Sequence, residues 1–205
     1  MIKQALIIGC GGHARVVGAA LNALNAPIYG YLDGSYKKGI TEVIKYGSLI
    51  GVPEDIIQLD RQQYDVYVAV GDNHKRGKLI NEILALGFAM PALIHPKSVI
   101  ESDCNIADAS HVCLGANLAT EVKLGRGVII NTGSSVDHES SIADYTHIAP
   151  KVVIAGRVSI GKKVFIGIGA CIAQNINIGD EAIIGAGAIV LKDVPANTKI
   201  FGVFH

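Results

Sequence analysis

The chain has 205 residues, 50% of them hydrophobic, and its 18 Lys and Arg equal its 18 Asp and Glu, so no net charge attracts it to nucleic acid or to an anionic membrane. No apolar run reaches the roughly 18 residues of a membrane span, and the N-terminus lacks the apolar length and cleavage region of a signal peptide. The four cysteines show no CxxC spacing. We therefore expect a cytoplasmic protein with reduced thiols and with neither nucleic acid nor membrane as a partner.

The first part of the chain alternates short apolar runs, glycine turns and helical segments. Strands are expected at residues 3–8, 28–32 and 65–70, and helices from the first glycine turn to about residue 24, from about residue 53, and at 75–86. The rest of the stretch before residue 64 is polar and weakly patterned. This alternation predicts a small α/β domain with a parallel sheet, which we assign to residues 1–91.

The first glycine turn, Gly9-Cys-Gly-Gly-His-Ala14, matches the dinucleotide fingerprint, and Asp33 follows at the end of the second strand. Glycines of this kind let backbone amides at a helix N-terminus approach a diphosphate, while the acid binds a ribose or base. A tight packing turn is the alternative interpretation. Because the domain is about half of a full dinucleotide-binding domain, the turn favours a nucleoside diphosphate over a complete NAD.

A second polar turn, Gly71-Asp72-Asn73-His74, follows the third strand. The carboxyl ends of parallel strands lie at one edge of a sheet, where open α/β sheets bind ligands. The turn therefore becomes a candidate part of the same site. Its alternative role is an ordinary helix N-cap by Asp72 or Asn73.

The second part of the chain carries a six-residue repeat. From residue 94 to residue 190, every sixth residue is Ile, Leu or Val, at 17 positions without a slip, and the residue four later is always small or β-branched. Neither a helix nor a strand requires this period, so it predicts a β-helix built of hexapeptides, three to a coil. One aliphatic side chain per hexapeptide points inward and forms a continuous apolar column. We assign residues 92–205 to this all-β domain.

One outward stretch of the repeats, residues 131–150, is rich in His, hydroxyl and acidic residues. Val136 and Ser140 keep the inward positions, so His138 and Glu139 lie outside. A neighbouring carboxylate raises imidazole basicity and fixes its tautomer, which makes His138 a candidate general base; a solvated surface histidine is the alternative. His138 and His147 are half a coil apart and could meet through a neighbouring subunit, as a trimer would allow.

Three segments, residues 131–139, 141–150 and 155–161, resemble the signature of one sugar acyltransferase family. Its members include bacterial nucleotide-sugar N-acetyltransferases and sialic acid O-acetyltransferases. The resemblance extends over the whole chain, including residues 9–17, 31–34 and 70–73. It implies a left-handed β-helix behind a Rossmann-like nucleotide-sugar-binding domain, and a homotrimer with active sites between subunits. It also implies acetyl-CoA as the co-substrate and no metal.

The resemblance further implies direct attack of a sugar 4-amino group on acetyl-CoA. His138 would be the general base and Glu139 the acid that raises its basicity. The expected acetyl-CoA contacts are His147, Gly156, Ile168 and Ala186. The expected nucleotide-sugar contacts are Gly11, Gly12, His13, Asp33, Gly71 and His74. Three positions depart from the family pattern, which commonly has an acid at Gly34 and glycines at Lys151 and Ala186.

Three other functions are compatible with the residues. The acceptor could be a hydroxyl group of a sialic acid or related sugar, because the motifs are specific to the family but not to one nucleotide or sugar. A zinc ion held between subunits by His111, His138 and His147 would support hydration chemistry. A trimer that only senses a nucleotide would use the first domain alone.

Overall fold

The computed structural model describes residues 3–38 and 42–205 and divides into two compact units, residues 1–96 and 97–205. The division falls a few residues after the boundary expected from the sequence, and each unit is described by itself. In the described residues, no helix has the length and apolar character needed to cross a membrane.

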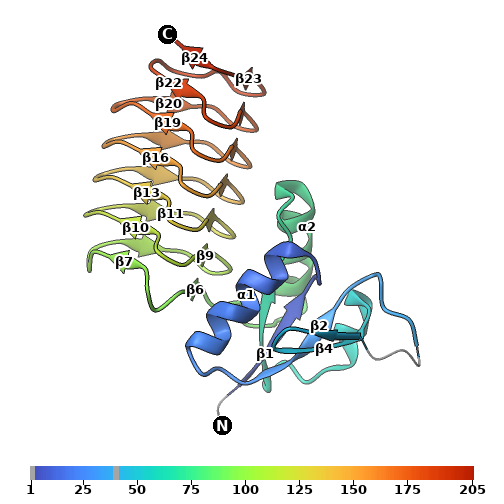
Figure 1. Ribbon diagram of the computed structural model, residues 1–205. Helices are drawn as coiled ribbons and strands as arrows, with labels where there is room; N and C mark the ends of the chain where they lie inside the picture. The colour runs from blue at the N-terminus through green and yellow to red at the C-terminus, as the bar shows by residue number, and fades with distance from the viewer. Residues whose placement is uncertain (1–2, 39–41) are drawn as a thin grey trace. The chain divides into compact units, whose positions relative to one another are not determined.

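The first unit is an α/β domain around a five-stranded sheet with the order β3-β4-β2-β1-β5 (Figure 1). Its elements are β1 (Gln4–Ile8), α1 (Gly12–Ala23), β2 (Ile28–Leu32), β3 (Glu42–Ile44), β4 (Gly47–Gly51), the 3₁₀ helix η1 (Pro53–Gln58), β5 (Tyr64–Val68), α2 (Asn73–Ala85) and β6 (Leu93–Ile94). Strands β1, β2, β4 and β5 are parallel, which confirms the predicted sheet.

The sequence did not predict β3 and β4, which form an antiparallel hairpin in the weakly patterned segment. Strand β4, Gly-Ser-Leu-Ile-Gly, has too little β propensity to stand out alone. It forms because it pairs with β2 and buries Leu49, which is 4% exposed. The helix expected from Pro53 is confirmed only as one short 3₁₀ segment.

The second unit is a parallel β-helix of two-residue strands that form three faces (Figure 1). Face 1 contains β7 (Val99–Ile100), β10 (Asn117–Leu118), β13 (Ser135–Val136), β16 (Val153–Ile154), β19 (Cys171–Ile172), β22 (Ile189–Val190) and β24 (Val203–Phe204). Face 2 contains β8 (Asn105–Ile106), β11 (Lys123–Leu124), β14 (Ser141–Ile142), β17 (Ser159–Ile160) and β20 (Asn177–Ile178). Face 3 contains β9 (His111–Val112), β12 (Ile129–Ile130), β15 (His147–Ile148), β18 (Phe165–Ile166), β21 (Ile183–Ile184) and β23 (Lys199–Ile200). Strands of one face pair in parallel, coil upon coil, as the six-residue repeat predicts.

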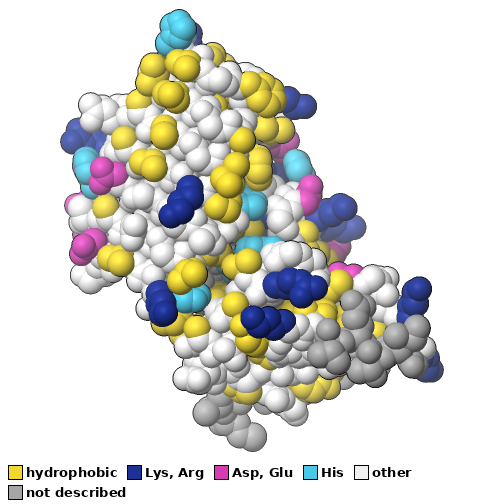
Figure 2. Space-filling view, in the orientation of Figure 1, with side chains coloured by type: hydrophobic (Ala, Val, Ile, Leu, Met, Phe, Trp, Pro, Cys, Tyr) yellow, Lys and Arg dark blue, Asp and Glu magenta, His cyan; other side chains and the backbone are white. Residues whose placement is uncertain are grey.

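The first residue of each two-residue strand points outward. The most apolar of these outward side chains lie on face 1, in its later coils. Val153, Ile189 and Val203 are 50%, 40% and 57% exposed on this face. Figure 2 shows hydrophobic side chains gathered on the C-terminal part of the β-helix. On face 2 the outward residues are polar: Asn105, Lys123, Ser141, Ser159 and Asn177.

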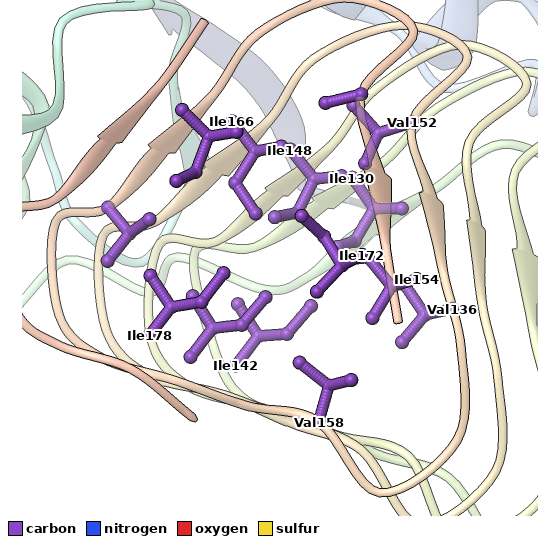
Figure 3. Close-up of a cluster of buried hydrophobic side chains, with 14 of the residues drawn as sticks. Ile130, Val136, Ile142, Ile148, Val152, Ile154, Val158, Ile166, Ile172 and Ile178 are labelled. Atoms are coloured by element: carbon purple, nitrogen blue, oxygen red, sulfur yellow. The ribbon is translucent and has the colours of Figure 1, made fainter. Parts of the chain in front are cut away.

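The second residue of each strand points inward and forms the apolar column, which Figure 3 shows from Ile130 to Ile178. From Val112 to Val190, every residue of the six-residue repeat is buried. The first three positions depart from the prediction: Ile100 and Ile106 are half-buried, and Ile94 is 37% exposed. For Ile100 and Ile106 the reason is their place in the first coil of the unit, which has a neighbouring coil of that unit on one side only.

Most corners of the β-helix contain one residue with left-handed backbone, where φ is positive. Between faces 3 and 1, the residues in this conformation stack one per coil: Gly115, Gly133, Lys151, Gly169 and Gly187, with φ between 59° and 68°. Lys151 therefore adopts the conformation that glycine adopts in the neighbouring coils. The lysine at a position where a glycine was expected therefore keeps the positive φ of this corner.

Candidate active site

The corner between faces 1 and 2 holds an imidazole and a carboxylate side by side. Nδ1 of His138 lies 2.9 Å from Oε2 of Glu139, and Nε of Arg157 donates to the same oxygen at 2.9 Å. Glu139 and Arg157 are the left-handed residues of successive coils, both with φ 57°. The Arg157 N–H donates to the His138 carbonyl at 2.9 Å and joins the two turns. The outward positions predicted for His138 and Glu139 agree with their side-chain exposures of 38% and 47%.

Hydrogen bonds from His138 and then from Arg157 hold the pKa of the Glu139 carboxyl below its ordinary value. The carboxylate therefore stays ionised at neutral pH and accepts an N–H from Nδ1. With the proton on Nδ1, Nε2 keeps its lone pair and can take a proton from a substrate. Arg157 was not among the residues expected in the site, although its spacing of one coil from Glu139 is a signal for a stacked pair.

The ring of His138 lies against Gly156 of the next coil. A Cβ at Gly156 would stand 2.5 Å from both Cε1 and Nε2, so only glycine leaves room for the imidazole. One coil earlier, the Asp137 carboxylate accepts the backbone N–H of His138 at 2.8 Å. Ala155, which precedes Gly156, has no such acceptor, and among the described residues none engages the Gly156 N–H. A proton acceptor and a backbone donor thus stand next to each other.

The corner between faces 3 and 1 carries the other residues expected in the β-helix. Nε2 of His147 lies 3.1 Å from Nδ2 of Asn131, and its ring packs edge-on against Phe165 at 5.3 Å between centroids. These contacts fix the imidazole, and Asn131 is a partner that the sequence analysis did not identify. Ile168, 55% exposed, and Ala186 stack at the same place in successive coils and form an exposed apolar strip.

Within one chain these two corners stay apart, on either side of face 1. Gly156 lies with His138 and Glu139, whereas Ile168 and Ala186 belong to the other corner, which His147 of β15 borders from face 3. The sequence placed Gly156 among the acetyl-CoA contacts; the fold adds that it is packed against the candidate base.

In the first unit, the carboxyl ends of β1, β2 and β5 bring the predicted loops together. Gly9 N donates to the Leu32 carbonyl and Ala69 N to the Ile8 carbonyl, each at 2.8 Å. Helix α1 begins after Gly11 with no side-chain cap and no acid in its first turn. Added Cβ atoms at Gly11 and Gly12 would meet nothing within 4 Å. With half-buried His13 beside them, these open amides can receive an anionic group.

Asp33 stabilises the glycine turn through hydrogen bonds. Its carboxylate accepts hydrogen bonds from Cys10 N at 3.1 Å and from Ser35 N at 2.9 Å. Desolvation raises the pKa of Asp33, but the hydrogen bonds from Ser35 and Cys10 outweigh it and hold the pKa below its ordinary value. The acid that was expected to bind a ribose or base therefore also has a structural role.

The turn after β5 reaches the same edge. Asp72 accepts a hydrogen bond from Lys75 N at 2.8 Å, so the helix-capping interpretation is confirmed for this residue. Gly71 is half-buried with open space at its Cα, and His74 is exposed. The buried Arg76, which was not expected in the site, donates a hydrogen bond from Nη1 to the Gly71 carbonyl of this turn.

A cavity of about 630 Å³ lies beside the carboxyl ends of β2 and β4. It is lined by Tyr29, Leu32, Tyr36, Lys38, Ile50, Val52, Asp55, Gln58 and Leu59. Aromatic walls with a few polar groups are typical of sites for flat polar rings.

The three histidines considered for a metal do not cluster. His111 is 2% exposed on face 3, two strands from His147, while His138 lies at a different corner. Among residues 3–38 and 42–205, no three His, Cys, Asp or Glu side chains are grouped to hold a metal ion.

Comparison with known proteins identifies relatives over both units. The family described as the PglD N-terminal domain matches residues 4–83. The acetyltransferase domain of PglB from Neisseria gonorrhoeae FA1090, in complex with acetyl coenzyme A, is 32% identical with a TM-score of 0.94, covering 98% of this chain and 97% of that one. PerB from Caulobacter crescentus, in complex with CoA and GDP-perosamine, is 30% identical with a TM-score of 0.92, covering 98% and 95%. WeeI from Acinetobacter baumannii AYE shares the fold at 24% identity, with a TM-score of 0.89 and coverage of 98% and 97%.

Proposed function

The chain belongs to the family of hexapeptide-repeat sugar acetyltransferases that includes PglB and PerB, and we propose that it acetylates the 4-amino group of a nucleotide-linked amino sugar in the cytoplasm. Acetyl-CoA is the acyl donor. Residues 1–91 would bind the nucleotide sugar, and residues 92–205 would carry out the transfer. The observation that carries this proposal is the His138–Glu139 pair beside the open N–H of Gly156.

The reaction is a direct acyl transfer. The amine nitrogen attacks the thioester carbonyl carbon, and Nε2 of His138 takes a proton from the nitrogen as the C–N bond forms. The Gly156 N–H donates to the oxyanion of the tetrahedral intermediate. Collapse of the intermediate breaks the C–S bond, and the CoA thiolate takes up the proton that His138 accepted, which returns the imidazole to its neutral form. Glu139 stabilises the imidazolium during these steps, and Arg157 keeps its carboxylate in place.

The environments of Cys113 and Cys104 argue against an acyl-cysteine intermediate at these two residues and in this respect favour direct attack. Burial raises the pKa of Cys113 to about 12, and desolvation raises that of Cys104. A protonated, buried thiol is a poor nucleophile.

A homotrimer would complete the site. Face 1 lies between the corner of His138 and the corner of His147, Ile168 and Ala186, and its later coils are apolar and exposed. If three copies packed with face 1 toward a three-fold axis, the first corner of each copy would meet the second corner of the next. Acetyl-CoA would then lie along Ile168 and Ala186 of one subunit, with its thioester near His138 of another.

Features of the first unit support a nucleotide-linked acceptor over a free sugar. The open amides of Gly11 and Gly12 suit a diphosphate, and His13, Gly71 and His74 border the same edge. The cavity beside β2, lined by Tyr29 and Tyr36, has room for a nucleobase. A free sialic acid would leave both features without a ligand.

The test is release of free CoA thiol from acetyl-CoA with a panel of acceptors. The panel contains 4-amino sugars linked to UDP, GDP and TDP, together with CMP-sialic acid and free sialic acid. Release with one amino-sugar nucleotide supports the proposal and names the substrate. Release with a sialic acid alone would replace it with O-acetylation, and no release with any acceptor would overturn the enzymatic assignment of this site.

A further inference from the structure

Arg76 is the largest fully buried side chain in the described residues, with 0% of its surface exposed. From α2 its guanidinium donates hydrogen bonds to the turn after β5: Nη1 to the carbonyls of Gly71 at 2.9 Å and Val70 at 3.2 Å, and Nη2 to Oδ1 of Asn73 at 2.8 Å. Desolvation lowers the pKa of Arg76 to about 10, so the group remains a cation at neutral pH. Burying this charge is costly, and a fold that needs only packing here would use an apolar side chain.

These bonds determine how the turn after β5 presents its backbone. In a trans peptide the C=O and N–H point in opposite directions, and the described residues contain no cis peptide. Because the Gly71 carbonyl points toward the guanidinium, the Asp72 N–H of the same peptide points away from it. Gly71 has open space at its Cα, so a ligand can approach this side of the turn.

We propose that Arg76 is a positioning residue, which fixes the turn at residues 70–73 so that the N–H of Asp72 donates to an oxygen atom of the nucleotide sugar. The proposal rests on the proposed function, because it assigns the turn to that substrate. The acceptor oxygen belongs either to the diphosphate or to the sugar. Positioning the turn requires the several N–H donors of a planar guanidinium. A lysine in the same place has a single nitrogen and cannot bond two carbonyls and an amide in one plane.

The experiment compares Arg76→Lys with the full-length wild-type enzyme on its acceptor. We expect KM for the nucleotide sugar to rise about tenfold or more, from the loss of hydrogen bonds to a charged donor. KM for acetyl-CoA should change by less than about twofold, because the acetyl-CoA contacts lie in the β-helix. Binding of the matching nucleoside diphosphate is measured alongside. Weaker binding in Arg76→Lys assigns the turn to the diphosphate, and unchanged binding with a raised KM assigns it to the sugar. An unchanged KM in a folded variant overturns the proposal.

Two further measurements separate positioning from folding. Lys78→Met removes an exposed cation from the same helix and serves as the control. It should leave both KM values unchanged, whereas Arg76→Met should raise the KM for the nucleotide sugar. If the Arg76 variants fail to fold, amide hydrogen exchange on the wild-type protein tests the proposal in their place. Addition of the nucleotide sugar should slow exchange of the Asp72 amide, and unaltered exchange there contradicts the proposal. A wild type that turns over no nucleotide sugar refutes the proposed function instead, and the two failures are thereby distinguished.

Discussion

His138 and Gly156 are in direct contact across two successive coils, with the Cα of the glycine against the Cε1–Nε2 edge of the imidazole. The contact sets the position of the candidate base, because a side chain at residue 156 would occupy the space of the ring. It also places the N–H of Gly156 beside the nitrogen that would accept the proton. The pair thus combines a general base with a donor for the oxyanion, the two functions that acyl transfer requires.

Gly156→Ala is expected to lower kcat by about a hundredfold, since a small displacement of a catalytic group has a cost of this size. The backbone at Gly156 does not have positive φ, so the fold should tolerate alanine. The double variant with His138→Ala provides the control. If the methyl group acts by displacing the imidazole, Gly156→Ala should have little further effect once His138 is absent. If the losses of kcat in the two single variants add fully in the double variant, displacement of the imidazole is not the cause.

His138→Ala is expected to lower kcat by about 10²- to 10⁴-fold, the usual contribution of a general base. Because the side chain is exposed, oligomeric state, melting temperature and nucleotide-sugar affinity should remain those of the wild type. Kinetics, sedimentation and calorimetry on one preparation check these expectations. A variant that retains full turnover would remove His138 from the chemistry.

Glu139→Gln should lower kcat, because an amide is a weaker acceptor for the Nδ1 N–H of His138 and no longer stabilises the imidazolium that forms during proton transfer. The pKa of Glu139 lies below its ordinary value, so the carboxylate is ionised at neutral pH, where kcat is measured. In the background of His138→Ala the same substitution should have little further effect, because Glu139 then has no imidazole to act on. A loss of equal size in both backgrounds would show that Glu139 does not act through the imidazole.

Mixed oligomers test whether the site is shared between subunits. His138→Ala and Ile168→Glu damage different corners of the β-helix, so each variant should be nearly inactive alone. If one site uses a corner from each of two neighbours, co-expression in equal amounts restores intact sites, up to about a quarter of the total by random assembly. Activity no greater than the sum of the separate variants would indicate that each chain carries a complete site.

Two adjacent residues of β17 test the inward register. Ile160 is 2% exposed in the column, whereas Ser159 points outward on the polar face 2. Ile160→Asp buries an unpaired charge and should destabilise the fold by more than about 3 kcal/mol. Ser159→Asp should remain within about 0.5 kcal/mol of the wild type. Thermal unfolding of both variants measures the difference, and equal melting temperatures would refute the register.

Much of this protein follows from local periodicity. Ile148 and Val152 occupy fixed places in a six-residue repeat, and that phase alone places them inside and His138 and Glu139 outside. Likewise the glycine turn after β1 and the acid after β2 lie at one edge in any parallel sheet. Period and strand order assign a residue to a face, an edge or a column without knowledge of its neighbours.

Only the tertiary structure decided which side chains meet. Arg157 on Glu139, His138 on Gly156 and Asn131 on His147 are contacts across coils, and they depend on corner backbone and rotamers that the repeat does not specify. Strand β4 exists because β2 provides a partner, and Arg76 is buried because the turn after β5 offers acceptors to its guanidinium. The repeat determined the column because burial depends on the phase of one residue type, whereas the site needs several side chains to converge in space.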